Sequence, residues 1–268
     1  MLIRMRLVAL QAVILLLVGV GLGRRTSAKD ALRQRLIQEA YSEHLARLKD
    51  VLPKYSGLPP LVDVSESKPD QGDVERAWEE RFKGVMGFST EIVDRGVESP
   101  TRATSISLAT VEWGTHVYAL PARSCGAVII AEPVASEARV AQNRLFVYSR
   151  FSLHISQILK ANRKMGIQRG QSIIATQFGG SVRFQSGHME TFLLAKEGFL
   201  ERHNQYVLFI WKPAESKRAF MIAQPYLVDH GMVYPVSTIA DASAYDGMPA
   251  ESFEAKVRAA IAKNIDTD

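Results

Sequence analysis

The chain has 268 residues, with 33 Lys and Arg against 28 Asp and Glu, one cysteine, and 47% hydrophobic residues. This length permits one large domain or one domain with additional segments, and the hydrophobic fraction is ordinary for a globular protein. The net charge of +5 falls to +3 without Arg4 and Arg6, so the chain lacks the dense basic surface that nucleic-acid binding needs. One cysteine excludes an internal disulfide, and Cys125 is expected to be a buried apolar residue.

Residues 1–25 predict a signal anchor or signal peptide. Two arginines precede an apolar run at residues 7–22, and Arg24 and Arg25 follow it. A positively charged head before an apolar core is typical of an export segment, although a membrane helix usually needs roughly 20 apolar residues. Because the arginines lie at the small-residue cleavage sites, we expect an uncleaved membrane anchor and a periplasmic location for the rest of the chain. The alternative is a protein secreted after signal cleavage.

Residues 26–104 predict two helices and a linker. Residues 26–52 carry apolar side chains at helical spacing and predict an amphipathic helix that ends at Pro53. This helix can serve as a stalk, as a dimer helix or as a helix packed on the main domain. Residues 53–104 predict a linker rich in proline and glycine, with a short helix whose N-cap is Asp73.

Residues 105–237 predict a β domain of short strands separated by glycine turns. We expect a bend or bulge near Ser149 and Arg150, and a tight Gly179-Gly180 turn that pairs the strands on either side of it. The expected strands are residues 105–110, 115–120, 127–131, 145–158, 172–177, 181–184, 206–211, 219–223, 227–229 and 232–236. Such spacing is typical of a sandwich or a small barrel.

Residues 238–268 predict a C-terminal helix with an apolar stripe that packs on the barrel. The fold expected for the whole chain is therefore α+β. It is a small, mostly antiparallel β-barrel or sandwich with flanking helices, preceded by an N-terminal membrane-anchor helix.

Residues 125–235 resemble a β domain that recurs in exported bacterial proteins of unassigned role. The resemblance rests on the segments GAVIIAEPV, LFVYSRFSLHISQILKA and GQSIIATQFGGSVRF, and on QYVLFIW and PYLVDHGMVYPV after them. It implies a closed sheet of five or six strands, similar to an OB barrel. It carries no known activity and therefore implies no functional residues.

Basic and aromatic residues near the predicted barrel loops form a candidate ligand site. OB-like barrels often bind ligands across such loops, where cations steer the ligand and aromatic rings stack on it. An envelope glycan or an acidic partner is the expected ligand, rather than nucleic acid. The candidate residues are Arg163, Lys164, Arg169, Phe178, Arg183 and Phe184.

A hydrolase with a metal site is the alternative. His188 and Glu190 would share one face of a strand, and His203 would be the third ligand. The sequence has neither a paired His-x-x-x-His nor a Gly-x-Ser-x-Gly motif, so we assign no catalytic residue, metal or cofactor. The preferred interpretation is a membrane-anchored envelope protein that acts as a non-enzymatic binding or assembly module. Its expected partner is an envelope protein or a cell-wall glycan.

Overall fold

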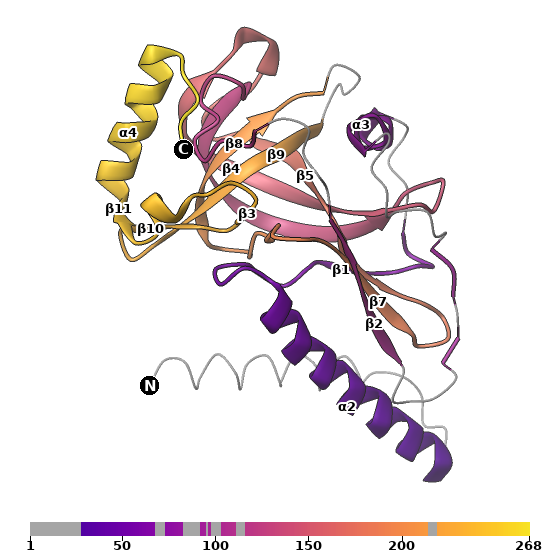
Figure 1. Ribbon diagram of the computed structural model, residues 1–268. Coiled ribbons are helices and arrows are strands. Elements are labelled where there is room, and N and C mark those ends of the chain that lie inside the picture. Colours follow the sequence, from indigo (N-terminus) through magenta and orange to yellow (C-terminus); the bar gives the residue numbers. More distant parts are fainter. Residues whose placement is uncertain are drawn as a thin grey trace.

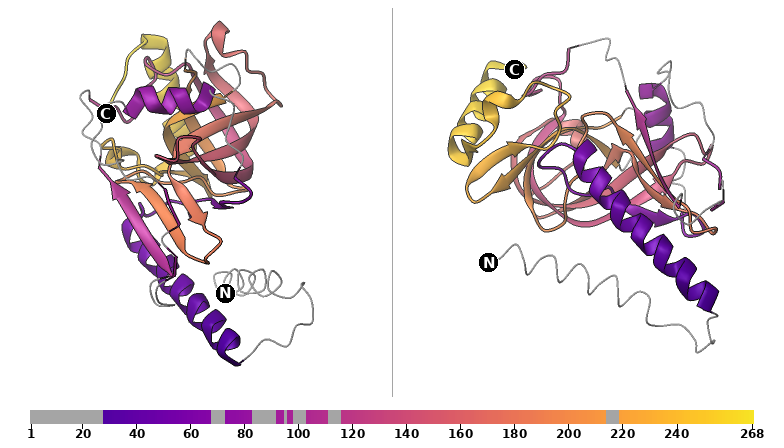
Figure 2. Two further views of the ribbon diagram at one scale, coloured as in Figure 1. Left: turned by 90° about the vertical axis from the view of Figure 1, so that its right-hand side faces the viewer. Right: turned by 60° about the horizontal axis from the view of Figure 1, so that its bottom comes forward.

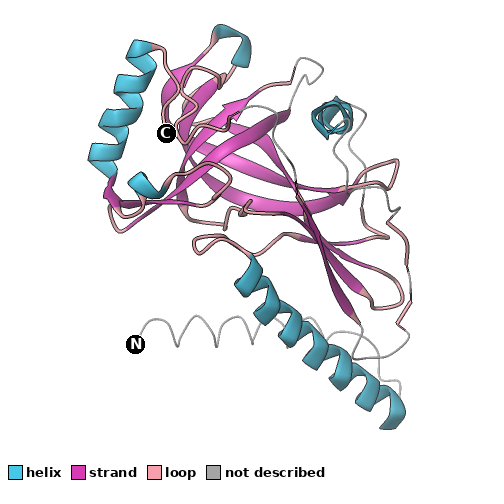
Figure 3. Ribbon diagram, viewed as in Figure 1, coloured by secondary structure: helices cyan, strands magenta, loops and turns pink. Residues whose placement is uncertain are grey.

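The computed structural model describes residues 28–67, 73–82, 92–94, 96–97, 103–110, 116–213 and 219–268. The anchor expected at residues 1–25 lies outside these ranges. Within them, no helix combines the length and the apolar character that crossing a membrane requires. The fold is α+β and rich in mostly antiparallel sheet, as predicted, with the helices at the periphery of the strands (Figure 3).

The described helices are α2 (Ala28–Val51), α3 (Asp73–Phe82) and α4 (Ala250–Lys263), with short 3-10 turns η2 (Arg163–Met165) and η3 (Ser243–Tyr245). All three helices were predicted. The first strands are β1 (Leu61–Asp63), β2 (Thr104–Ala109), β3 (Ala127–Val140), β4 (Val147–Ala161), β5 (Ser172–Phe178) and β6 (Gly180–Arg183). The others are β7 (Met189–Leu194), β8 (Gln205–Trp211), β9 (Ala219–Asp229), β10 (Met232–Pro235) and β11 (Met248–Pro249).

Five strands close into a ring in the order β3, β4, β5, β9 and β8 (Figure 1). Neighbouring strands of the ring run antiparallel, except that β5 and β9 run parallel. Strands β10 and β11 extend the sheet beyond β9. The ring removes the free sheet edges that an open arrangement of these strands would leave.

The strand β8 shows how the core is divided. Successive side chains of a strand point to opposite faces. Tyr206 and Leu208 therefore join the cluster inside the ring, while Val207 and Phe209 join a second cluster beneath α4. In that second cluster Phe253 of α4 is fully buried. The strand is thus covered on both faces, and the prediction that the C-terminal helix packs on the barrel is confirmed.

A second sheet has the strand order β1, β6, β7 and β2, and α2 packs along it (Figures 1 and 2). Ala40, His44 and Leu48 recur every four residues of α2 and are buried. The first turns of α2 extend beyond the sheet, and Leu32 is 58% exposed there (Figure 2). Of the three roles considered for this helix, packing on the main domain is the one observed.

Gly179 and Gly180 carry the chain from the ring into the second sheet. The expected strand at residues 181–184 does not pair with β5. Instead β6 pairs with β7 and, in parallel, with β1. A Cβ atom at Gly179 would lie 2.5 Å from the carbonyl oxygen of Phe192, so the crossing requires glycine. The hairpin prediction was wrong because a glycine pair permits both a turn and a change of sheet.

Other strand predictions also need correction. Residues 116–120 form only a single bridge, between Leu120 and Thr267. Strand β3 continues well past residue 131, β9 is continuous through Pro225, and β7 was not predicted. The β3–β4 register is continuous at residues 149–150, and its irregularities lie instead between residues 128 and 135 of β3.

Lys160 secures the turn that precedes β3. Its ammonium donates hydrogen bonds to the carbonyl oxygens of Ala122 at 2.5 Å, Cys125 at 2.8 Å and Arg123 at 3.3 Å. Replacing Lys160 by methionine should lower the free energy of unfolding by about 2 kcal/mol, because these carbonyls lose a charged donor. Chemical denaturation measures the change, with Lys164→Met as the exposed control. Equal stabilities of the two variants would show that the turn does not depend on Lys160.

Candidate functional site

Three predicted ligand residues, Arg163, Lys164 and Arg169, lie in the loop between β4 and β5, which we call the basic loop. All three are exposed, and none pairs with a carboxylate in the part of the chain that the structure describes. Met165 is buried beneath the loop, and its sulfur packs closely on Gly126. A Cβ atom added to Gly126 would lie 2.5 Å from this sulfur. The loop therefore holds three cations on an anchored backbone.

The other three predicted residues lie elsewhere. Phe178 is at the far end of β5 from the basic loop, and both it and Phe184 are buried in separate hydrophobic clusters. Arg183 lies in the second sheet, where its Nη2 donates to Oδ2 of Asp63 at 2.7 Å. The expectation that these aromatic rings lie beside the loop cations is wrong. Phe178 ends the strand that leads away from the basic loop, and Phe184 follows the change of sheet after that strand.

The three candidate metal ligands do not meet. His188 and Glu190 are buried in the second sheet, where they contact the hydroxyls of Ser105 at 3.1 Å and Ser107 at 2.6 Å. His203 precedes β8 and is exposed. No group of three His, Cys, Asp or Glu among the described residues is arranged to hold a metal ion. The metal site of the hydrolase alternative is therefore wrong.

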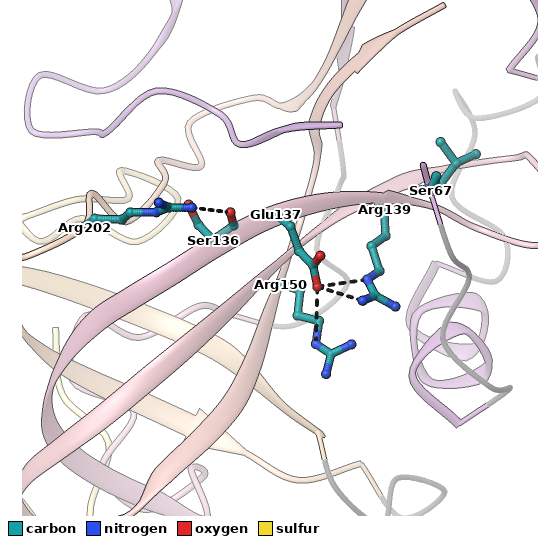
Figure 4. Close-up of polar contacts among 7 residues, drawn as sticks. Ser67, Ser136, Glu137, Arg139, Arg150 and Arg202 are labelled. Carbon is teal, nitrogen blue, oxygen red and sulfur yellow. Dashed lines mark hydrogen bonds and ion pairs between the residues drawn. The ribbon is translucent and has the colours of Figure 1, made fainter. Parts of the chain in front are cut away.

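A shared carboxylate joins the ribbon formed by β3 and β4 (Figure 4). Oε1 of Glu137 accepts hydrogen bonds from Arg139, at 2.7 Å from Nη2, and lies 3.8 Å from Nε of Arg150. Glu137 stands directly opposite Arg150 in the ladder. Arg202 donates to the carbonyl oxygen of Ser136 at 2.8 Å. Sequence reasoning did not propose these cations as site residues. Their contacts indicate a structural role, with Arg150 paired to Glu137 across the strands and Arg139 paired to it along β3.

A groove of about 450 Å³ was also missed by sequence reasoning. Its lining comes from the loop after α2, from the turn between β7 and β8, and from residues 235–246. This volume is within the range of small-molecule sites, about 300–1,000 Å³. The groove lies apart from all six predicted ligand residues, none of which lines it.

Charges of both signs line this groove. Lys54 and Lys196 form a lysine pair, and Asp241 and Asp246 form an aspartate pair. The hydrogen bond that Lys54 donates to the Tyr55 hydroxyl raises the pKa of the lysine. Hydrogen bonds from the hydroxyl and the backbone N–H of Ser243 lower the pKa of Asp241. Both groups are therefore charged at neutral pH.

Backbone contacts hold the segments of the groove together. The N–H of Gly57 donates to the carbonyl of Phe199 at 2.8 Å, and the N–H of Phe199 donates to Oγ of Ser56 at 2.8 Å. On the other side, Thr238 donates its N–H to the carbonyl of Lys196 at 2.8 Å. The groove is thus formed by contacts of the fold itself.

The ring of Tyr55 is already in contact with other side chains. Tyr234 lies 4.4 Å away between ring centroids, and Nζ of Lys54 lies over the ring at 4.6 Å from its centroid. The Tyr55 ring is therefore partly covered by side chains of the protein itself.

Cys125 is buried, as expected, and its burial raises the pKa of the thiol to about 11. A thiolate is the nucleophilic form of cysteine. At neutral pH this residue is therefore a packing residue beneath α4 and does not serve as a nucleophile.

No known protein-family model matches this chain, and a search of curated proteins finds no match either.

Proposed function

We propose that the protein is a membrane-anchored envelope protein whose β domain acts as a non-enzymatic binding or assembly module. The basic loop is the observation that carries this proposal. Three exposed cations without described carboxylate partners are held on an anchored backbone, which favours a partner with acidic groups. The apolar run at residues 7–22 supports the anchor.

The topology of the ring adds support. Five strands closed on one another are similar to an OB barrel, which binds ligands on the face of its second and third strands. In this chain those strands correspond to β4 and β5, which the basic loop joins, whereas the binding loops of such barrels correspond to the β3–β4 and β8–β9 connections. Such barrels have many functions, so the partner is inferred from the loop cations rather than from the fold.

Crosslinking in intact cells tests the proposal. After purification from the membrane fraction, mass spectrometry should identify an envelope protein that is lost when Arg163, Lys164 and Arg169 are each replaced by glutamate. The matched control replaces Lys256 and Lys263 of α4 by glutamate and should keep the partner. Recovery of the protein from the cytosol would contradict the anchor. A protein that stays in the membrane without a crosslinked partner would shift the proposal to a cell-wall glycan.

A further inference from the structure

The lysine pair and the aspartate pair of the groove come from different parts of the fold. The lysines lie on the loop after α2 and on the turn after β7, whereas both aspartates precede β11. No ion pair within 4 Å joins the two pairs among the residues that the structure describes. The charge of Asp246 lies near enough to Lys54 to contribute to the raised pKa of the lysine, but no hydrogen bond or ion pair joins the two described residues. Each pair can therefore still bind a group of opposite charge on a ligand.

The charges exclude several ligand classes. A purely anionic ligand would be repelled by the aspartate pair, and a purely cationic one by the lysine pair. A hydrocarbon chain would remove four charged side chains from water without compensating them. A neutral sugar usually stacks on a free aromatic face, and the ring of Tyr55 is already in contact with Tyr234 and Lys54.

The rest of the lining fits a small, partly apolar ligand. Ile239, Ala240 and Ala242 are among the lining residues, with Ser237 and Thr238 beside them. Ala240 and Ala242 are also buried in the cluster beneath α4, so Ile239 supplies most of the apolar side-chain surface. A ligand that carries one ammonium and one carboxylate on a short aliphatic frame satisfies both charge pairs and this apolar surface. We propose that the groove binds such a zwitterion, namely an amino acid or a short peptide with free termini. This site is separate from the basic loop and does not depend on the function proposed above.

Titration of the purified full-length protein with L-alanine and with L-alanyl-L-alanine tests this proposal. The readouts are calorimetry and NMR of ¹³C-labelled methyl groups of isoleucine and alanine. We expect saturable shifts of the Ile239, Ala240 and Ala242 signals. Tighter binding of the dipeptide would identify a peptide site, and tighter binding of alanine an amino-acid site. Acetylating the amino terminus or amidating the carboxyl terminus of the dipeptide should each weaken binding about tenfold, because one charge-assisted contact is lost.

Variants of the groove test which charge pair binds which terminus of the ligand. Replacing Asp241 and Asp246 by asparagine should weaken binding of dialanine about tenfold but leave binding of its acetylated form unchanged. Replacing Lys54 and Lys196 by glutamine should likewise weaken binding of dialanine about tenfold but leave binding of its amidated form unchanged. The matched control, Lys256→Gln with Lys263→Gln, changes two lysines that line a different pocket on α4 and should leave binding unchanged.

Three results would overturn the zwitterion site. The first is the absence of methyl shifts with either probe at millimolar concentration. The second is equal binding of free and blocked dipeptides. The third is shifts of the same methyl groups with cellobiose or inorganic phosphate but not with dialanine. The basic loop is unchanged in every variant of the groove. Absence of zwitterion binding would therefore not affect the crosslinking test of the basic loop.

Discussion

Replacing Gly179 by alanine is expected to lower the free energy of unfolding by about 3 kcal/mol. The new Cβ would lie 2.5 Å from the backbone oxygen of Phe192, so β7 would have to move. The φ angle of +89° adds strain, because a side chain in the left-handed region costs about 1–2 kcal/mol. Chemical denaturation of the purified chain measures the loss.

Gly170→Ala is the matched control for this prediction. Gly170 has a φ angle of +78°, but a Cβ there would meet no atom within 4 Å. This variant should therefore lose only the strain contribution, about 1 kcal/mol. The difference between the two variants in lost free energy of unfolding measures the cost of the close approach between Gly179 and β7. Equal losses would show that the crossing between the sheets tolerates a side chain.

The sequence predicted those elements whose signals are local. The apolar repeat of α2, the N-cap position of α3 and the apolar stripe of α4 each lie within one short window, and all three helices are present. The strand β8 was recognised because its apolar side chains run without interruption, which matches its burial on both faces. The expected strands at residues 227–229 and 232–236 are also present, joined by His230 and Gly231, whose positive φ angles are those that a two-residue turn needs.

The elements that were missed depend on contacts between distant segments. Strand β7 is buried at every position and so lacks the alternation of a half-buried strand. A Gly-Gly pair is compatible both with a hairpin turn and with a crossing between two sheets, so the pair after β5 does not distinguish them. Only the distant partners of β6, namely β1 and β7, distinguish the two.

The groove could not be predicted for a related reason. Lys54, Lys196 and Asp241 are separated by large stretches of sequence, and each is an ordinary exposed charge in its own segment. Their convergence depends on the bridge between Gly57 and Phe199, which joins the loop after α2 to the segment before β8. The loop cations were easier to find because they lie within seven positions of one another.

The contact between α2 and the second sheet is expected to make the protein less stable in acid. His44 of α2 is fully buried, and its Nε2 lies 2.8 Å from Oγ1 of Thr191, while its Nδ1 has no described hydrogen-bond partner. Burial, with smaller contributions from the nearby charges of Arg47 and His188, lowers the pKa of His44 from 6.5 to about 4. Protonation therefore places an uncompensated charge between the helix and the sheet.

The sign of the effect follows from proton binding. Between pH 6.5 and about 4 the unfolded chain binds a proton at His44 that the folded chain does not, so stability falls as the pH falls. The full loss, reached below pH 4, is about 3 kcal/mol, since one pKa unit corresponds to about 1.4 kcal/mol. Denaturation of the wild-type protein at a series of pH values should show a slope in this range, with the free energy of unfolding falling as the pH falls.

His44→Gln should remove most of this slope, because glutamine retains hydrogen-bonding groups but does not titrate in this range. His154→Gln is the matched control, since His154 is exposed on β4 and should leave the slope unchanged. A His44→Gln variant that keeps the wild-type slope would show that other groups account for the acid sensitivity. A flattened slope would identify the junction of α2 and β7 as the part of the fold that acid weakens.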